Sequence, residues 1–267
     1  MSDGHILVHT GEMFDHLEPT SELDPLAFAE ILCPYDPTKI IGIWNNFHEA
    51  AEKQGWTKPE EQLYFVKSAS SQLAPGGTTV EPQSYDGRVF FEGEPGVVIG
   101  RRCRDVSASE VADCVFGYTC VNDVTVFQIV KKDPAFQQWS RAKSFDTSGP
   151  FGPDNCDRSG PTVTSDHCDR WQQDCPVSDM FFTPLELVQW ISRDMTLFPE
   201  DIISCGTSVG ALPMKPGGIV EIRIDGIGTL TNTFAEDPVG ALPLHMSRKR
   251  FTQQRVPTSP RALILSP

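Results

Sequence analysis

Residues 86–102, DGRVFFEGEPGVVIGRR, decide our interpretation of the chain. Aromatic and β-branched residues dominate this stretch and glycines interrupt it, which predicts a pair of strands or one long kinked strand. Glu92 and Glu94 flank Gly93, and because strand side chains alternate, both carboxylates lie on one face roughly 7 Å apart. Between FF and GVVIG they are poorly hydrated, so the pair needs a cation, a proton or full exposure to solvent.

A third carboxylate, Asp123, lies in another apolar strand pattern, GYTCVNDVTVFQIV at residues 117–130. Three hard oxygen ligands with open positions suit Mg²⁺, with Mn²⁺ or Ca²⁺ as alternatives. The structural alternative is that Glu92 and Glu94 lie on a solvent-facing strand edge while Asp123 caps a turn with Asn122. The residue pattern alone leaves both interpretations open, because E-x-E recurs by chance in acidic proteins.

The rest of the chain adds many short strands and few helices. Strands are predicted at KIIGIW, LYFVKS and DIISCGT, and a hairpin at MKPGGIVEIRIDGIGTLTNTF, while KSFDTSGPFGP is expected to be a loop. We expect three helices, which are NNFHEAAEKQG closed by Gly55, a segment from Ser107 to Gly117, and a segment starting at Thr183. Without regular strand–helix alternation, the pattern favours an α+β, β-rich fold with a mixed β-roll or barrel.

Composition divides the chain into three parts and excludes some functions. Residues 1–38 are expected to form an N-terminal cover segment, residues 39–234 the main domain, and the proline-rich residues 235–267 a flexible tail. The net charge of −14 gives no support for binding nucleic acid or an anionic membrane. With no apolar run of the ~18 residues that a span needs and no signal sequence, we expect a cytoplasmic protein.

Five motifs recur in a familiar order. They are FFEGEPGVVIGRR, GYTCVNDVT, RAKSFDTSGPFGP, MTLFPEDIISCGTSVG and MKPGGIVEIRIDGIGTL. In this order and spacing the chain resembles the fumarylacetoacetate hydrolase superfamily, in particular its short members that contain only the catalytic domain.

The resemblance implies a fold, a metal and a set of site residues. It implies a mixed β-roll, a homodimer, and Mg²⁺ (or Mn²⁺ or Ca²⁺) on Glu92, Glu94 and Asp123. The family's lysine matches Lys143, for which a surface ion pair is the structural alternative. The family's glycine–threonine motif, where the substrate carboxylate or oxo group is held, matches Gly206 and Thr207.

The implied chemistry is that of a metal-stabilised enolate of a small oxo acid. The leading expectation is hydrolysis of a C–C bond in an acylpyruvate-like acid. The same scaffold also resembles that of oxo-acid decarboxylases, tautomerases and sugar-acid dehydratases, so these activities are alternatives. A catalytically inactive paralogue is a further alternative.

The segment NNFHEAAEK departs from the family pattern, which places a catalytic base on a short mobile helix. With Asn45 and Glu52 aligned, Glu49 occupies the histidine position and His48 lies one residue earlier. One residue is a turn of roughly 100° on a helix, so His48 and Glu49 point in different directions. Either Glu49 or Glu52 is the base, or the helix starts differently and His48 serves. A solvated helix face is the structural alternative.

Two further departures concern Pro95 and residues 154–176. Proline directly after the glutamate pair removes a ladder donor, which suggests a sheet edge or a weakened strand. Residues 154–176 contain three cysteines and one aliphatic residue, where the family has two strands. A zinc site at Cys156, His167, Cys168 and Cys175 lacks the usual ligand spacing, and we favour a local reading-frame error in the gene or gene model.

Overall fold

The computed structural model describes residues 5–12, 14, 16–25, 31–85, 87–155, 173–236 and 261–263. The chain divides into two compact units, Met1–Ile31 with Asp237–Pro267, and Leu32–Glu236. In the first unit, β1 (His5–Glu12) pairs with β2 (His16–Pro25) and with β13 (Arg261–Leu263), all antiparallel. Most of the predicted flexible tail, and residues 156–172 of the suspected frame-shifted segment, lie outside the described residues.

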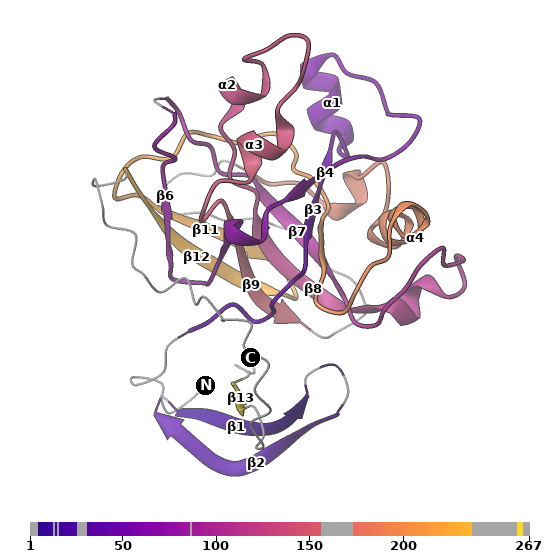
Figure 1. Ribbon diagram of the computed structural model, residues 1–267, viewed down its shortest axis with the longest axis vertical. Coiled ribbons are helices and arrows are strands. Elements are labelled where there is room, and N and C mark those ends of the chain that lie inside the picture. The colour runs from indigo at the N-terminus through magenta and orange to yellow at the C-terminus, as the bar shows by residue number, and fades with distance from the viewer. Residues whose placement is uncertain are drawn as a thin grey trace. The chain divides into compact units, whose positions relative to one another are not determined.

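The second unit is built on a curled, mixed sheet of seven strands in the order β4-β3-β10-β7-β8-β9-β5 (Figure 1). Its strands are β3 (Ile40–Trp44), β4 (Leu63–Lys67), β5 (Gln72–Leu73), β7 (Gly93–Ile99), β8 (Val115–Asn122), β9 (Gly149–Asn155) and β10 (Ile202–Ser204). The pairs β10–β3 and β5–β9 are parallel, and the other neighbours are antiparallel. This arrangement confirms the predicted α+β, β-rich fold with a roll-like mixed sheet.

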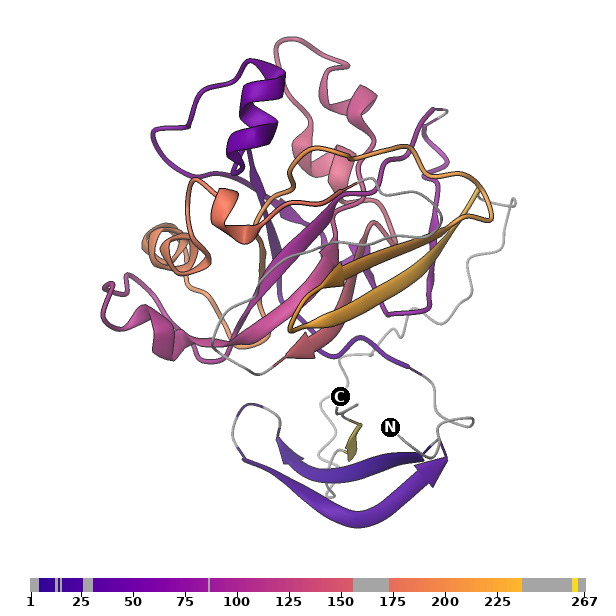
Figure 2. The ribbon, with the colours of Figure 1, turned by 180° about the vertical axis from the view of Figure 1, so that it is seen from behind.

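A smaller sheet in the order β11-β12-β6 lies beside the large one (Figure 2). Its strands are β11 (Ile219–Ile224), β12 (Gly228–Ala235) and β6 (Thr78–Val80), and the first two form the predicted hairpin. Ile222, Ile224 and Leu230 form a buried cluster with Cys120 of β8, which joins the two sheets. The large sheet therefore also buries apolar residues on the face that packs against the smaller sheet.

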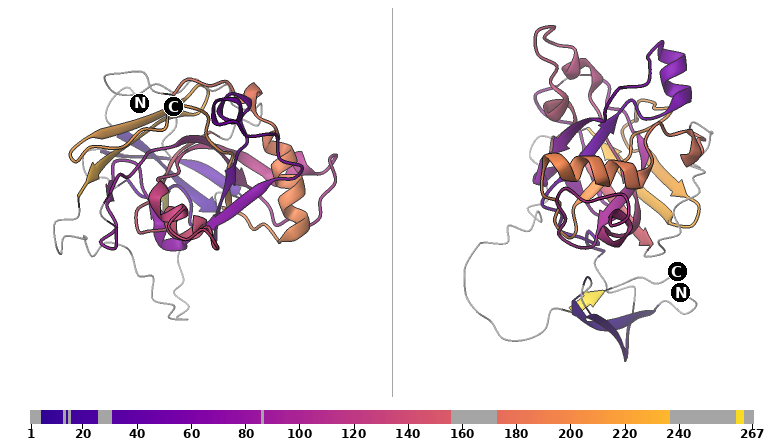
Figure 3. Two further views of the ribbon diagram at one scale, coloured as in Figure 1. Left: turned by 90° about the horizontal axis from the view of Figure 1, so that it is seen from above. Right: turned by 90° about the vertical axis from the view of Figure 1, so that its right-hand side faces the viewer.

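The described residues contain four α-helices: α1 (His48–Gln54), α2 (Phe127–Val130), α3 (Trp139–Lys143) and α4 (Pro184–Asp194). They also contain three short 3-10 turns: η2 (Ala69–Ser71), η3 (Val111–Cys114) and η4 (Val177–Asp179). Helix α4 has the predicted capping box between Thr183 and Glu186, and it packs Leu187 and Ile191 into the main core. Helices α1, α2 and α3 project from one end of the large sheet (Figure 3). No helix among the described residues is long and apolar enough to cross a membrane.

The structure corrects several local predictions. Gly117 does not end a helix, because only the short turn η3 follows Ser107 and β8 already begins at Val115. The predicted strand through residue 130 stops at Asn122, after which FQIV forms α2. The loop predicted at residues 143–153 becomes β9 from Gly149. Residues from Val115 and from Gly149 form strands because they pair with neighbouring strands, whereas residues 127–130 have no strand partner in the described part of the chain and form a helix.

Pro95 is not at a sheet edge, because β7 lies between β10 and β8. Its carbonyl oxygen accepts a hydrogen bond from the backbone N–H of Cys205, so the nitrogen of Pro95 also faces the β10 side. The ladder to β10 ends at the pair Ser204–Gly96. The missing donor of Pro95 therefore falls just past the end of that ladder.

Candidate metal centre

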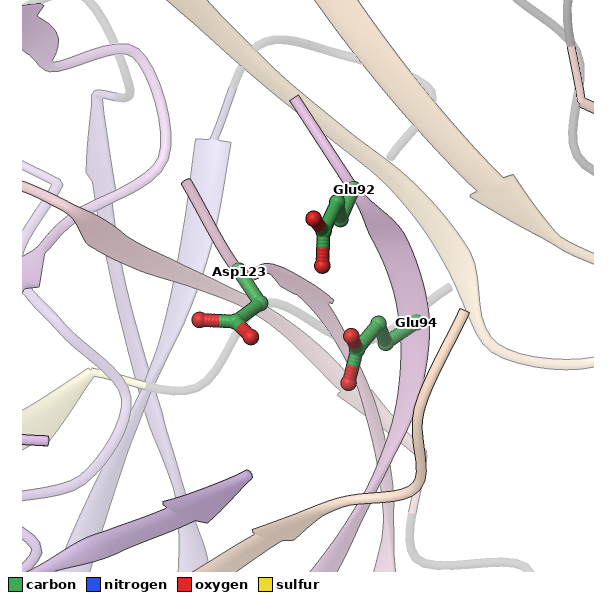
Figure 4. Close-up of side chains that lie close together, drawn as sticks. All are labelled: Glu92, Glu94 and Asp123. Carbon is green, nitrogen blue, oxygen red and sulfur yellow. The ribbon is translucent and has the colours of Figure 1, made fainter. Parts of the chain in front are cut away.

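Three carboxylates meet where β7 begins and β8 ends. The register pairs Gly93 with Asn122, which places Glu92 and Asp123 side by side just outside the ladder. The N–H of Asp123 donates to the Glu92 carbonyl at 2.9 Å, and the N–H of Glu92 donates to the Asn122 side chain at 3.1 Å. One carboxylate oxygen from each of Glu92, Glu94 and Asp123 lies within 4.8 Å of the other two (Figure 4).

All three residues of this carboxylate cluster are buried. Glu92, Glu94 and Asp123 expose only 4%, 2% and 1% of their surface. Glu92 and Glu94 therefore do not lie on a solvent-facing strand edge. Buried carboxylates require compensation by cations or protons, since an isolated buried charge costs several kcal/mol.

Two buried lysines supply part of that compensation. Lys143 Nζ donates to Glu92 Oε2 at 2.7 Å and to Asp123 Oδ2 at 2.5 Å. Lys67 Nζ donates to Asp123 Oδ1 at 2.7 Å, and also to the carbonyl of Lys143. Lys143 ends α3 and Lys67 ends β4, so two further elements are tied to the carboxylate cluster.

Glu94 is held by hydroxyl and amide donors. Its Oε2 accepts from Ser204 Oγ at 2.5 Å and from the N–H of Gly206 at 2.9 Å. Thr207 Oγ1 donates to the Gly93 carbonyl at 3.1 Å and accepts from Gln173 Nε2 at 2.5 Å. The segment 204–207, which follows β10, thus fixes the strand that carries both glutamates.

Burial and charge shift the pKa values in opposite directions within the carboxylate cluster. Burial, reinforced by the charge of Asp123, raises the pKa of Glu94 to about 8, and burial also raises the pKa of Glu92. Burial acts on Asp123 too, but the ammonium groups of Lys143 and Lys67 outweigh it and hold the pKa of Asp123 below its ordinary value. Glu92 and Glu94 therefore carry protons more readily than Asp123.

The donor set fits a hard divalent cation. Three carboxylates converge in a buried site that has, among the residues described, only two lysines as hydrogen-bond partners. Oxygen ligands of this kind suit Mg²⁺, Mn²⁺ or Ca²⁺ rather than a metal that prefers thiolate or imidazole. The carboxylate cluster could therefore hold a divalent metal.

Comparison with known proteins gives the family. The model of the fumarylacetoacetate (FAA) hydrolase C-terminal domain matches residues 39–235. The chain belongs to the fumarylacetoacetate hydrolase family. An uncharacterized protein of Archaeoglobus fulgidus is 36% identical over 234 residues, which are 86% of this chain and 88% of that protein.

Two solved structures of this family resemble the chain closely. The 2-hydroxyhepta-2,4-diene-1,7-dioate isomerase of Mycobacterium marinum is 33% identical with a TM-score of 0.76, over 86% of this chain and 87% of that chain. The 5-carboxymethyl-2-hydroxymuconate delta-isomerase of Mycobacterium smegmatis is also 33% identical with a TM-score of 0.76, over 85% and 89%. These matches confirm the family and the fold expected from the five sequence motifs.

The three residues predicted as a base lie on α1. Helix α1 begins at His48, which is exposed and packs its ring at 4.1 Å from that of Phe181. Glu49 pairs with Lys53 at 2.7 Å on the helix surface, and Glu52 is exposed. Among the described residues, no hydrogen bond or ion pair joins α1 to Glu92, Glu94 or Asp123. Which of the three residues acts as a base stays a prediction.

Sequence analysis missed Lys67, the second lysine at the carboxylate cluster. The strand LYFVK alternates, so Leu63, Phe65 and Lys67 share one face, and Phe65 is buried. A lysine on the buried face of a strand requires an anionic partner, and that pattern was a usable signal. Ser204 and Gln173 were missed as well, and nothing in their local sequence marks them.

Proposed function

We propose that this chain is a Mg²⁺-dependent enzyme that forms the enolate of a small acylpyruvate-like oxo acid and hydrolyses a C–C bond in it. The observation that carries the proposal is the convergence of Glu92, Glu94 and Asp123 within 4.8 Å in a buried site that also contains Lys143. Membership of the fumarylacetoacetate hydrolase family supports it.

Glu92, Glu94 and Asp123 would hold the metal. When bound, a divalent cation supplies Lewis-acid polarisation of the oxo and carboxylate oxygens of the substrate, which stabilises an enolate. The hard oxygen ligands favour Mg²⁺, with Mn²⁺ and Ca²⁺ as alternatives.

The chain's own residues would orient the substrate and balance its charge. The Lys143 ammonium, buried beside Glu92 and Asp123, adds a fixed positive charge where the substrate oxygens would develop negative charge. Burial excludes water from this charge, which strengthens its effect. Thr207, anchored by its contacts to Gly93 and Gln173, stays our proposed contact for the substrate carboxylate, together with Gly206.

A second candidate function is keto–enol tautomerisation. Two observations favour it: among the described residues no hydrogen bond or ion pair joins α1 to the carboxylate cluster, and the two solved structures compared above are named as isomerases. Tautomerisation needs the enolate but no activated water, whereas hydrolysis also needs a base, proposed here as His48, Glu49 or Glu52 on α1. Decarboxylation shares the enolate and is separated from both by its CO₂ product.

A product assay on purified protein tests these proposals. The protein is first treated with EDTA and then supplied with Mg²⁺ and acetylpyruvate, oxaloacetate or a sugar acid. Release of acetate and pyruvate supports hydrolysis, and exchange of solvent deuterium into the C3 position without cleavage supports tautomerisation. CO₂ release would indicate a decarboxylase, and a metal-binding protein without any turnover would indicate an inactive paralogue.

We also propose that the protein is a cytoplasmic homodimer. Cys103, Cys114, Cys120, Cys175 and Cys205 are buried free thiols, which suits a reducing compartment. Sedimentation velocity at several protein concentrations tests the dimer, since a single monomeric species throughout would refute it.

A further inference from the structure

Helices α1, α2 and α3 project from one end of the large sheet (Figure 3). Residues of β3, β4, α2 and α3 line a large pocket. Its volume is about 1170 Å³. We call it the aromatic pocket, after the tryptophan and phenylalanine residues that line it: Trp44, Trp56, Phe65, Phe90, Phe127 and Trp139. They come from β3, the loop after α1, β4, the segment before β7, α2 and α3, so the fold assembles the pocket from six places in the sequence.

The aromatic pocket and the carboxylate cluster meet at the ring of Phe65. Phe65 lines the pocket, and the Nζ atom of Lys143 lies 5.1 Å from the centre of its ring. The same Nζ atom donates to Glu92 and Asp123. A ligand whose acid end lies at Lys143 would therefore extend past Phe65 into the aromatic pocket.

The rings in the aromatic pocket contact one another in tilted and stacked pairs. Trp44 lies 4.8 Å from Trp56 and 5.8 Å from Trp139 between ring centres, and Phe65 stacks on Trp139 at 6.1 Å with an interplanar angle of 16°. Trp56 nevertheless leaves 40% of its surface exposed. Aromatic ligands gain from such surfaces through offset-stacked and edge-to-face contacts beyond the burial of area.

One polar group also points to a ligand. Gln62 lines the aromatic pocket and exposes only 9% of its surface, yet its Nε2 atom has no hydrogen-bond partner among the described residues. A buried donor without a partner costs roughly 1–3 kcal/mol, which a ligand acceptor would recover. Among the described residues that line the pocket, Lys131 alone is ionic, and none is anionic and able to repel an acid.

Resting on the proposed function, we propose that the aromatic pocket binds the aryl group of an aroylpyruvate whose ring carries a hydrogen-bond acceptor. Such a substrate has its 2-oxo acid end at the carboxylate cluster and its ring among Trp44, Trp56 and Trp139. A small alkyl oxo acid leaves most of the volume unused, since pockets of roughly 300–1,000 Å³ already accommodate drug-sized ligands.

The reaction consumes one water and balances without a redox partner. The bond between the aryl ketone carbon and the neighbouring CH₂ breaks. The hydroxyl of water joins the ketone carbon, giving the aryl carboxylic acid, and a proton joins the CH₂ carbon, giving pyruvate. Both products are acids, so release of one arylcarboxylate and one pyruvate in equal amounts is the signature.

The first test compares three substrates with the wild-type protein and Mg²⁺. We expect kcat/KM for benzoylpyruvate to exceed that for acetylpyruvate at least about tenfold, because burying one ring contributes more than 1.4 kcal/mol. We expect a further gain of about fivefold for 4-methoxybenzoylpyruvate, and its loss in Gln62→Leu, because one neutral hydrogen bond contributes about 1 kcal/mol. Equal turnover of all three acids would overturn the inference and leave the proposed function intact.

Variants then place the effect in the aromatic pocket. Trp56→Ala and Phe127→Leu should each lower the ratio of benzoylpyruvate to acetylpyruvate kcat/KM at least about fivefold through the loss of ring contacts. Trp190→Ala is the matched control, since Trp190 is 42% exposed on α4 and does not line the pocket. A ratio that changes equally in all three variants would overturn the inference.

Direct binding separates the inference from the proposed function. Three of the five tryptophans in the sequence line the aromatic pocket, so benzoylpyruvate should quench tryptophan fluorescence, and less so in Trp56→Ala. Quenching without turnover of any acid would support the pocket and refute the enzyme. If Trp56→Ala instead dissociates a dimer in sedimentation and leaves the ratio unchanged, a second copy covers the pocket and the inference is wrong.

Discussion

Lys67 places its Nζ atom 2.7 Å from Oδ1 of Asp123, and both side chains are buried, with Lys67 only 1% exposed. Burial lowers the pKa of Lys67, and Asp123 counteracts that shift. Lys143 holds the other oxygen of Asp123, so one carboxylate is clamped by two ammonium groups. Asp123 is thereby fixed as the most acidic member of the carboxylate cluster.

Replacing Lys67 by methionine should lower the free energy of unfolding by about 3 kcal/mol, because removing one partner leaves a buried charge uncompensated. Urea denaturation in the presence of EDTA measures the loss. Lys132→Met is the control, since Lys132 is exposed and should change the stability by less than about 0.5 kcal/mol. The double variant Lys67→Met with Asp123→Asn should be more stable than the sum of the two single losses predicts. Simple additivity would show that the pair is not coupled.

Asp123→Asn should weaken Mg²⁺ or Mn²⁺ binding by far more than about tenfold. Losing a residue that only hydrogen-bonds to a metal ligand already weakens binding by about tenfold, and Asp123 is proposed to be a ligand itself. Isothermal titration calorimetry on EDTA-treated protein gives the dissociation constant directly. Asp113→Asn is the matched control, because Asp113 is exposed on η3 and does not belong to the carboxylate cluster. Unchanged binding in Asp123→Asn would refute the metal site.

Metal affinity should rise with pH up to about 8. The raised pKa of Glu94, about 8, means that a proton must leave before the carboxylate binds a cation. Below that pH the affinity should fall by about tenfold per unit, and above it the dependence should flatten. Calorimetry at pH 6.5, 7.5 and 8.5 in buffers with different ionisation enthalpies measures both the slope and the released proton. A flat profile would show that Glu94 is already ionised.

The same shift fixes the sign of a stability effect. The folded pKa of Glu94 lies above its ordinary value of 4.5, so the folded metal-free protein binds a proton that the unfolded chain releases. The stabilisation from this group is complete below about pH 4.5 and is lost as the pH rises through about 8. Added Mg²⁺ should reverse the decline at the alkaline end, since it stabilises only the folded state.

The site residues that could be predicted from the sequence are those whose charged side chains occur within an apolar strand pattern. Glu92 and Glu94 lie in an apolar strand, and that conflict in the sequence indicates a cation. Lys67 carries the same conflict in LYFVK, but it becomes visible only when the strand face is tracked through Phe65. The helix signal at Ser107 misled for the opposite reason, because a real capping contact to Glu110 precedes only a 3-10 turn.

Long-range assembly set the limit of prediction. Trp44, Trp56 and Trp139 come from three segments whose spacing carries no shared period, so only the fold brings their rings together. Pro95 predicted a sheet edge because proline removes one hydrogen-bond donor from its strand. The strand order places β7 between β8 and β10, and β10 lies more than a hundred residues later in the sequence. Local sequence patterns were enough to predict most strands, whereas the arrangement of the site depends on the order of the strands in the sheet.

Gly206→Ala should disturb the centre without replacing a metal ligand. Gly206 has φ of +92°, which strains any residue with a Cβ, and an added Cβ would lie 3.1 Å from the Ile43 carbonyl oxygen and 3.2 Å from Asn46 Cβ. Its N–H holds Glu94, so relief of the clash would move that donor. We expect a loss of about 1–3 kcal/mol in the free energy of unfolding together with weaker Mg²⁺ binding.

The matched control for Gly206→Ala is Gly217→Ala, which shares a positive φ of +74° but would place its Cβ with nothing within 4 Å. That substitution should cost about 1 kcal/mol of backbone strain and leave the metal affinity unchanged. Thermal unfolding and calorimetry on both variants separate strain from site geometry, because only Gly206 lies against β3 and donates to Glu94. If the two variants bind Mg²⁺ equally well, the segment after β10 does not position Glu94, and the rigidity assigned to the centre is wrong.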